Sequence, residues 1–228
     1  TYLHVNFDSD AKLSLNRFGR LGTWYALALC VIATVAIIGQ VLIQTHLNDQ
    51  LSDSRVVNVA GKQRMLSQKI TKTVLLLHND QTDQERRQIL NDLSTSVHLW
   101  KVSQDGLLHG NDSLKLLGKN SETINKMFAS ISSDFAEMHR HSEQIISSLE
   151  KDLGVTYDSL RPSVSQILNH EGNFLTGMEG IVLQYANEAH GKVSSLSTME
   201  YIVLAIALLV IILEIIFIFR PTAQQVNA

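Results

Sequence analysis

Two long apolar blocks, one near each end of the 228-residue chain, constrain its fold more than any other feature. The first, residues 23–43, has no charged side chain, and Gln40 is its one strongly polar residue. The second, residues 201–219, carries the single charge of Glu214. A helix rises about 1.5 Å per residue, so each block is long enough to cross a hydrocarbon core roughly 30 Å thick. We therefore predict two transmembrane helices in contact with membrane lipid.

The charges that flank these blocks predict their orientation. Lys12, Arg17 and Arg20 precede the first block and Arg220 follows the second, whereas residues 44–53 are neutral or acidic. The positive-inside rule then places both ends of the chain in the cytoplasm. The predicted organisation is a cytoplasmic segment at 1–22, a transmembrane helix at 23–43, a translocated sensor domain at 44–200, a second transmembrane helix at 201–219 and a cytoplasmic linker at 220–228.

The translocated segment has a helical period throughout, and no run of alternating apolar and polar residues is long enough for a strand. The one cysteine, Cys30, lies inside the first apolar block. Neither a disulfide framework nor a thiolate zinc site is therefore expected. The net charge of −3 offers no basic surface of the kind that nucleic acid needs. We expect an all-α domain that is stabilised by helix packing and oligomerisation.

Four amphipathic helices fit this segment. The first continues from the apolar block to about His78, and Thr82 followed by Glu85 is a capping-box signature for the second. A loop is expected at residues 109–120, and the fourth helix is expected past Pro162. The predicted core positions are Val56, Val59, Leu66, Ile70, Val74 and Leu77; Leu90, Leu93, Val97, Trp100 and Leu107; Ile124, Phe128, Ile131, Phe135, Met138, Ile145 and Leu149; and Leu175, Met178, Val182, Tyr185, Ala189, Val193 and Leu196.

Short connections between four amphipathic helices predict an antiparallel four-helix bundle. Its first and last helices are expected to be continuous with the two transmembrane helices. Because a helix is a stiff rod, a displacement of one of these helices outside the membrane would reach the cytoplasmic side.

Residues 58–68, with the sequence Asn-Val-Ala-Gly-Lys-Gln-Arg-Met-Leu-Ser-Gln, are unusual for the middle of a long helix. Glycine there costs about 1 kcal/mol relative to alanine. At about 100° per residue, Arg64 points away from the core position Val59. It shares a second face with small or mildly polar residues: Val57, Ala60, Gly61, Gln68 and Thr71. Such a face suits close approach by a ligand or by the same helix of a second subunit in a C2 dimer.

In such a homodimer the two Arg64 guanidiniums would repel each other unless an anion lay between them. A guanidinium is planar and always charged, and it donates hydrogen bonds as a fork, so two facing forks suit a small planar oxyanion. Binding would favour one dimer geometry over another and thereby produce a signal. The alternative is an ordinary solvated arginine on a helix surface.

The same segment resembles the signature of the PilJ/NarX-type sensor domain, which occurs in nitrate- and nitrite-sensing kinases and in pilus-type chemoreceptors. The run at residues 178–189 resembles the last sensor helix of that family, and Arg220-Pro221 resembles the start of a HAMP linker. The resemblance implies a four-helix bundle, a homodimer and signalling to a kinase, cyclase or methyl-accepting domain. It also implies a bacterial inner-membrane protein whose sensor domain is periplasmic.

In nitrate-binding members, the arginine matched by Arg64 holds the anion together with its symmetry mate, and the glycine matched by Gly61 lies against it. Asn58, Ala60 and Gln68 are the supporting positions that this resemblance indicates. The chain departs from the nitrate kinases at Lys62-Gln63 and is nearer to the chemoreceptor-like branch. The identity of the ligand therefore stays open.

Other chemistry finds little support in the sequence. His139 and His141 are two residues apart and point in different directions on a helix, so we expect no metal site. No nucleophile elbow or phosphate-binding glycine loop is present, and we expect neither a cofactor nor catalysis within this segment. The nature of any output domain beyond residue 228 is open.

Two functional hypotheses remain. In the first, the domain senses nitrate or nitrite between two Arg64 side chains. In the second, it is an interaction module that responds to a pilus component or another periplasmic protein, and residues 58–68 are merely the dimer seam. The second hypothesis depends on exposed residues in the predicted loops at 109–120 and 154–161.

Overall fold

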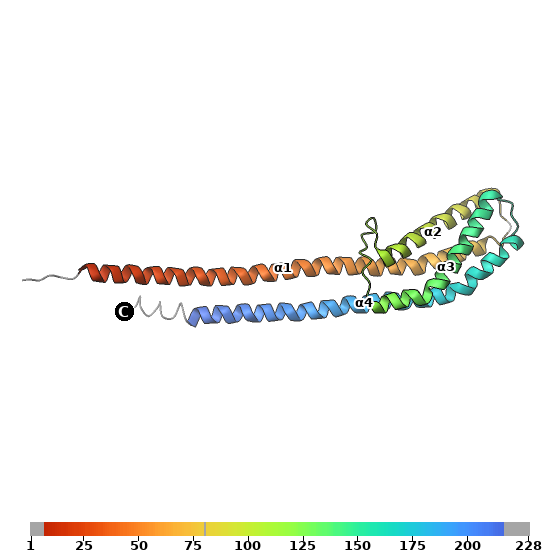
Figure 1. Ribbon diagram of the computed structural model, residues 1–228. Coiled ribbons are helices and arrows are strands. Elements are labelled where there is room, and N and C mark those ends of the chain that lie inside the picture. The colour runs from red at the N-terminus through yellow and green to blue at the C-terminus, as the bar shows by residue number, and fades with distance from the viewer. Residues whose placement is uncertain (1–6, 80, 217–228) are drawn as a thin grey trace, which may run out of the picture. The chain divides into compact units, whose positions relative to one another are not determined.

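A computed structural model describes residues 7–79 and 81–216 of the chain. They form four helices, α1 (Phe7–Leu76), α2 (Asp83–His109), α3 (Glu122–Lys151) and α4 (Tyr157–Glu214), which are labelled in Figure 1. These described residues contain no named strand and one isolated bridge, between Asn111 and Leu116. The prediction of an all-α fold with four helices is confirmed. The predicted linker at 220–228 lies outside the described residues.

The chain divides into two compact units. We call residues Asp49–Lys192 the bundle unit, and residues Thr1–Asn48 with Val193–Ala228 the apolar unit. Helices α2 and α3 belong to the bundle unit alone, whereas α1 and α4 contribute residues to both units.

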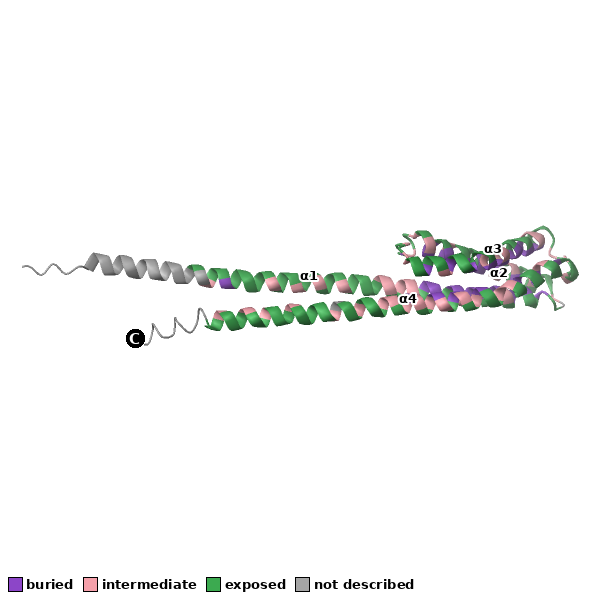
Figure 2. Cartoon of the chain, turned by 60° about the horizontal axis from the view of Figure 1, so that its bottom comes forward, coloured by how far each residue is buried: buried purple, intermediate pink, exposed green. Residues whose placement is uncertain are grey.

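The bundle unit has one apolar core to which all four helices contribute. Three aromatic side chains meet at its centre, because the Trp100 ring lies 4.3 Å from the Phe135 ring and 5.0 Å from the Phe174 ring, measured between centroids. Trp100 and Phe174 are completely buried. Figure 2 shows such buried residues, in purple, on all four helices of this unit. The cluster joins α2, α3 and α4 and fixes how they pack.

Neighbouring helices in the bundle unit run antiparallel, as predicted. Along α3 and α4, residue numbers rise on one helix while they fall on the other: Phe128 lies beside Tyr185, Asp134 beside His170 and His141 beside Ser163. The same holds for α1 and α4, where Asp53 pairs with Lys192 and Arg64 with Glu179.

Local sequence signals fix the start of α2. The Thr82 hydroxyl accepts a hydrogen bond from the Glu85 amide at 3.3 Å, and the Glu85 carboxylate accepts one from the Thr82 amide at 2.8 Å. This reciprocal pair satisfies backbone donors that have no partner within the helix. The predicted capping box is confirmed. The hydrogen bonds from Thr82 also lower the pKa of Glu85.

The predicted start of the fourth helix is wrong, because α4 begins at Tyr157 and Pro162 lies inside it. A proline inside a helix costs about 3 kcal/mol, since it removes a hydrogen bond and crowds the preceding turn. Here Leu160 and Val164, on either side of it, are both buried in the core. Burying two such side chains contributes roughly 1.5–3 kcal/mol each, which is enough to offset the proline.

The predicted core face of the fourth helix is partly wrong for the same reason. Phe174 and Ile181 are fully buried, whereas the predicted Leu175 and Val182 are only partly buried. Both the observed core positions and the predicted ones are apolar, so the sequence pattern alone does not distinguish these two faces of the helix. The buried turn around Pro162 sets the register, and a prediction that begins after Pro162 lacks that information. Met178 and Tyr185 are buried as predicted.

In the apolar unit, the described parts of α1 and α4 expose large apolar side chains. Figure 2 colours exposed residues green. Ile37 is 64% exposed and Leu209 is 58% exposed. Among the described residues, two helices are long and apolar enough to cross a membrane, judged by length and composition. They are candidate membrane spans. Their orientation stays a prediction.

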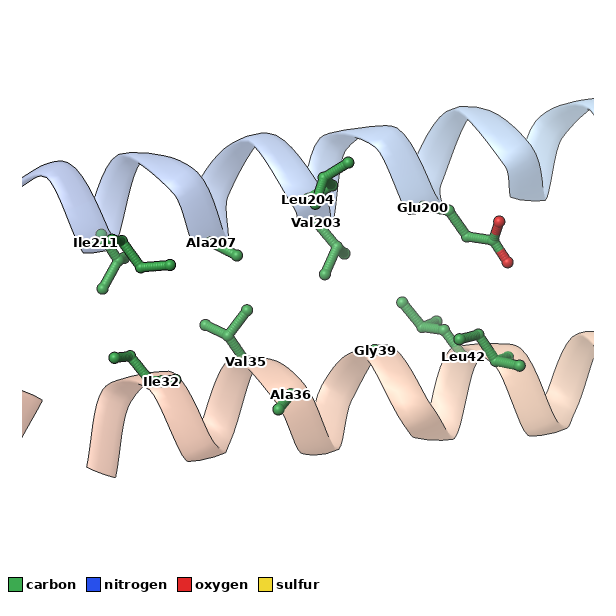
Figure 3. A pocket seen from close by; sticks show the side chains of 12 residues that line it. Ile32, Val35, Ala36, Gly39, Leu42, Glu200, Val203, Leu204, Ala207 and Ile211 are labelled. Atoms are coloured by element: carbon green, nitrogen blue, oxygen red, sulfur yellow. The ribbon is translucent and has the colours of Figure 1, made fainter. Parts of the chain in front are cut away.

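A groove of about 330 Å³ lies between α1 and α4 within the apolar unit. Figure 3 shows Val35 and Gly39 on one side of it, opposite Val203 and Ala207 on the other. A Cβ atom on Gly39 would lie 3.9 Å from the Val203 side chain, which is ordinary contact. The groove is lined by apolar residues and by one charged residue, Glu200.

Candidate ligand-binding site

Arg64, the main predicted site residue, lies on α1 in the bundle unit with 37% of its side chain exposed. Its Nη2 atom is 3.4 Å from Oε1 of Glu179 on α4, whose side chain is 54% exposed. Ion pairs between side chains that are exposed to this degree contribute about 0–1 kcal/mol. The guanidinium is therefore weakly held within the protomer, and a competing anion can reach it.

The surroundings of Arg64 leave further binding capacity unused. Its Nε atom is buried and has no hydrogen-bond partner among the described residues. One turn earlier, a Cβ atom added at Gly61 would meet nothing within 4 Å. Packing inside the chain therefore gives no reason for a glycine that costs about 1 kcal/mol in mid-helix. Open space adjoins Gly61.

The other predicted positions of this segment separate into two groups. Asn58 and Gln68 are exposed, whereas Ala60 is completely buried in the core of the bundle unit. The predicted second face is thus only partly open, because it is closed at Ala60. The reason is that α1 packs against both α2 and α4. A helix with two neighbours buries a stripe wider than one row of heptad positions.

Gln63 is a residue whose structural role the sequence analysis missed. It is fully buried, and its Nε2 atom donates a hydrogen bond to the Trp100 carbonyl of α2 at 2.9 Å. The spacing of residues could have predicted this burial, because Gln63 is four residues after Val59 and three before Leu66, at a regular core position. This hydrogen bond fixes the rotation of α1 immediately beside Arg64.

Buried polar atoms surround that hydrogen bond without partners. Oε1 of Gln63, Nε1 of Trp100 and Oε1 of Gln104 make no hydrogen bond to any described residue. An unsatisfied buried polar group costs about 1–3 kcal/mol. The layer of the core beside Arg64 thus contains polar as well as apolar groups.

The loop at 110–121 is folded back onto α2. Gly110 and Gly118 have φ angles of +91° and +64°, which few other residues adopt. A Cβ atom on Gly118 would lie only 2.2 Å from the Gly110 amide nitrogen, so only glycine fits there. Asn120 anchors the end of the loop by donating a hydrogen bond to the Leu107 carbonyl at 2.8 Å. The loop has a defined shape.

The second predicted loop, at 154–161, is shorter than predicted, since α4 already begins at Tyr157. The connection is held from α2. One guanidinium nitrogen of Arg86 donates to the carbonyls of Leu153 and Val155, the latter at 2.8 Å. Both ends of the bundle unit are therefore closed by ordered connections.

Residues 46–156 match a family model named PilJ, described as type IV pili methyl-accepting chemotaxis transducer N-term. The PilJ part of the predicted resemblance is confirmed. The matched residues include most of the described bundle unit up to the turn before α4, with Gly61 and Arg64 among them. The chain thus contains a signal-transducing sensor region of the chemotaxis-transducer type. No curated protein and no solved structure matches the chain.

The PilJ match does not specify a ligand. Neither the NarX part of the predicted resemblance nor nitrate specificity follows from it, since the description names a pilus-associated chemotaxis transducer. The chemistry around Arg64 is therefore what bears on the ligand.

Proposed function

We propose that the bundle unit is the sensor of a bacterial inner-membrane receptor and that it recognises a small planar oxyanion, nitrate or nitrite, at Arg64. The observation that carries this proposal is a partly exposed guanidinium with one weak ion pair, one turn from a glycine that has open space beside it. Charge-assisted hydrogen bonds from a guanidinium fork are the strongest that a side chain offers to such an anion.

The site becomes complete in a homodimer. Two copies of α1 approach each other at Gly61, where the absence of a side chain lets the backbones come close. The two Arg64 side chains then face one anion, which removes their mutual repulsion. Asn58 and Gln68 are exposed on the same helix and add neutral hydrogen bonds. Ala60 supports the site indirectly, by packing α1 into the core of its own protomer.

Anion binding competes with the Arg64–Glu179 ion pair. When the guanidinium turns toward the anion, α1 loses a contact with α4 and gains one with the partner subunit. Both helices contain a candidate membrane span, so a changed fit of α1 against α4 reaches the cytoplasmic side. A ligand shifts such an equilibrium only by the difference in its affinity for the two geometries.

A protein ligand is the second candidate. Leu117, at the folded-back loop, is 65% exposed, and the family description names type IV pili. In this version a pilus component or another periplasmic protein contacts the loop, and residues 58–68 serve as the dimer seam.

The test is calorimetric titration of the full 228-residue chain in lipid nanodiscs with nitrate, nitrite and chloride. Saturable binding of one nitrate or nitrite per two chains is expected. Arg64→Ala should weaken it by about 10-fold or more, the range for a charged hydrogen bond. Arg64→Lys should also weaken it, because an ammonium lacks the fork. Lys62→Ala is the matched control, since it removes an exposed charge two residues away, and it should bind like the wild type.

The absence of heat with all three anions, in protein shown to be helical and dimeric, would overturn the oxyanion proposal. It would favour the protein ligand, which is then testable through Leu117→Asp.

A further inference from the structure

A cavity of about 190 Å³ lies at the end of the bundle unit that contains the first and last residues of that unit. It is lined by Asp53 from α1, Asn120 from the folded-back loop, and Tyr185, Glu188 and Lys192 from α4. It is smaller than the roughly 300–1,000 Å³ of sites for drug-sized ligands. It therefore suits a small polar molecule, and it shares no residue with the Arg64 site.

The polar groups of this cavity are held in fixed orientations. The Tyr185 hydroxyl donates a hydrogen bond to Oδ1 of Asn120 at 2.6 Å, and Nδ2 of Asn120 donates to the Leu107 carbonyl. Because the amide nitrogen is committed to that carbonyl, the amide oxygen is fixed toward Tyr185. Asn120 and Tyr185 therefore keep their positions without a ligand.

Glu188 is oriented in the same way. Its Oε1 atom accepts hydrogen bonds from the Ser121 hydroxyl at 2.7 Å and from Nε2 of Gln184 at 2.8 Å. Both donors are neutral. Among the residues that the structure describes, no cationic side chain forms an ion pair with Glu188, whereas the neighbouring Asp53 is paired with Lys192 at 2.8 Å. Glu188 is thus a partly buried, pre-oriented carboxylate whose charge is not compensated by a cation.

The phenol of Tyr185 lies in the same cavity. Burial and then the Glu188 charge raise the pKa of the Tyr185 hydroxyl well above its ordinary value. The hydroxyl therefore stays protonated and acts as a hydrogen-bond donor. Of the charged residues that line the cavity, Asp53 and Lys192 pair with each other, whereas Glu188 has no ion-pair partner among the described residues. Asp49 and Lys119, both exposed, complete the rim of the cavity.

We propose that this cavity binds a small organic molecule through a primary ammonium group that pairs with Glu188. An ammonium carries three donors and a positive charge, so it can compensate the carboxylate while Oε1 keeps its two neutral donors. The loop and α4 enclose it, with α1 on the third side. This ligand site is independent of the oxyanion site proposed at Arg64.

Two sources share this chemistry, an amino acid and a simple amine. An amino acid also carries a carboxylate, for which the ammonium of Lys119 at the rim is the complementary group. A simple amine uses Glu188 alone and leaves Lys119 in water. A ligand of either kind would bridge α1, α4 and the loop, beside the Asp53–Lys192 pair that already joins the two long helices.

The experiment titrates the full chain in lipid nanodiscs calorimetrically with four ammonium probes: glycine, L-alanine, ethylamine and putrescine. Propionate, which is alanine without its ammonium, is the negative control. At least one ammonium probe should bind saturably and propionate should not. Glu188→Gln keeps the shape and the neutral hydrogen bonds but removes the charge. It should weaken binding by about 10-fold or more, as expected for loss of a charged hydrogen bond.

Glu171→Gln is the matched control, because it makes the same change on α4 at a residue that does not line the cavity. It should bind like the wild type, and so should Arg64→Ala. Binding of amino acids that Lys119→Ala weakens would identify an amino acid, and amine binding unaffected by Lys119→Ala would identify an amine.

Two results would overturn the proposal. One is the absence of heat with all four probes in protein whose helicity and melting temperature are normal. The other is binding that Glu188→Gln leaves unchanged. If Glu188→Gln alters the helicity, Tyr185→Phe provides the second test. It removes one oriented hydroxyl at nearly constant volume and should weaken the same probes, so unchanged affinity counts against the cavity.

Discussion

Helices α1 and α4 each extend through two regions, and the exposure of their apolar side chains differs between these regions. In the bundle unit, Ile70 and Ile181 are completely buried. In the apolar unit, Ile37 and Leu209 on the same two helices are mostly exposed. Both regions are helical, so helix formation does not distinguish them. The comparison shows that the distribution of apolar side chains around a helix indicates the solvent for which each region is suited.

That solvent is water for the bundle unit, since its apolar residues form one stripe per helix. The described part of the apolar unit suits hydrocarbon, because its two candidate spans expose large apolar side chains. A helix satisfies its own backbone hydrogen bonds, so such a segment is stable in a bilayer. The same exposed surface would be unfavourable in water by about 25 cal/mol per Å² of apolar area.

The largest effect should come from the centre of the bundle unit. Trp100→Ala removes the ring that contacts Phe135 and Phe174, and we expect a loss of about 3–5 kcal/mol of unfolding free energy. Denaturant unfolding of the full chain, followed by circular dichroism, measures it. Leu29→Ala is the control in the apolar unit, where the side chain is exposed, and should change the same transition little. Equal losses would mean that the two regions do not differ as we describe.

A charge inserted into each region should sharpen the comparison. Leu209→Arg places a guanidinium in the candidate span of α4 and should cost about 3 kcal/mol of membrane insertion. Leu99→Arg is the matched control, because Leu99 is similarly exposed but lies on α2 in the bundle unit. The measurement is the fraction of chain that resists alkaline extraction from membranes. Full resistance in both variants would argue against a span at residue 209.

Much of this fold could be predicted from local patterns, and the errors have identifiable causes. The capping box at Thr82 depends on two residues that are three positions apart, so it could be predicted directly from the sequence. The heptad of α3 was readable too, since Ile124, Phe128 and Met138 keep one register along the helix and are all buried. The start and register of α4 were not, because tertiary packing overrides the helix-breaking tendency of Pro162.

The candidate site was predictable in part. Arg64 and Gly61 stood out because their residue types are unusual in mid-helix. The partnership of Arg64 with Glu179 joins positions 115 residues apart, which no local pattern reports. The burial of Ala60 depends on α1 having two neighbours, which also requires the tertiary structure. The cavity around Glu188 was missed entirely, since a loop, α1 and α4 assemble it.

A smaller effect is expected from the polar layer of the core. Gln63→Ala removes the hydrogen bond to the Trp100 carbonyl, and we expect a loss of about 1–3 kcal/mol. Gln68→Ala, on the exposed side of the same helix, should stay within about 0.5 kcal/mol of the wild type. The denaturant transition used for Trp100→Ala measures both. If the two glutamines prove equivalent, the core position that we assign to Gln63 is wrong.

The smallest effect concerns pH and should be confined to the bundle unit. Burial lowers the pKa of His139 and of His141 below the ordinary 6.5, and the Arg140 charge lowers that of His141 further. The unfolded chain therefore binds more protons than the folded one once the pH falls below about 6.5, so stability should decrease as the pH falls. The folded bundle keeps these imidazoles neutral, and protonating them favours unfolding.

Melting temperatures at pH 7.5 and pH 5.5 test this, because that window lies above the ordinary pKa of 4.5 for the carboxylate of Glu137 beside His141. The wild type should melt at a lower temperature at pH 5.5. His141→Gln keeps a polar side chain but cannot be protonated, so its melting temperature should fall less between the two pH values. A fall as large as that of the wild type in a variant lacking both His139 and His141 would place the pH dependence elsewhere in the chain.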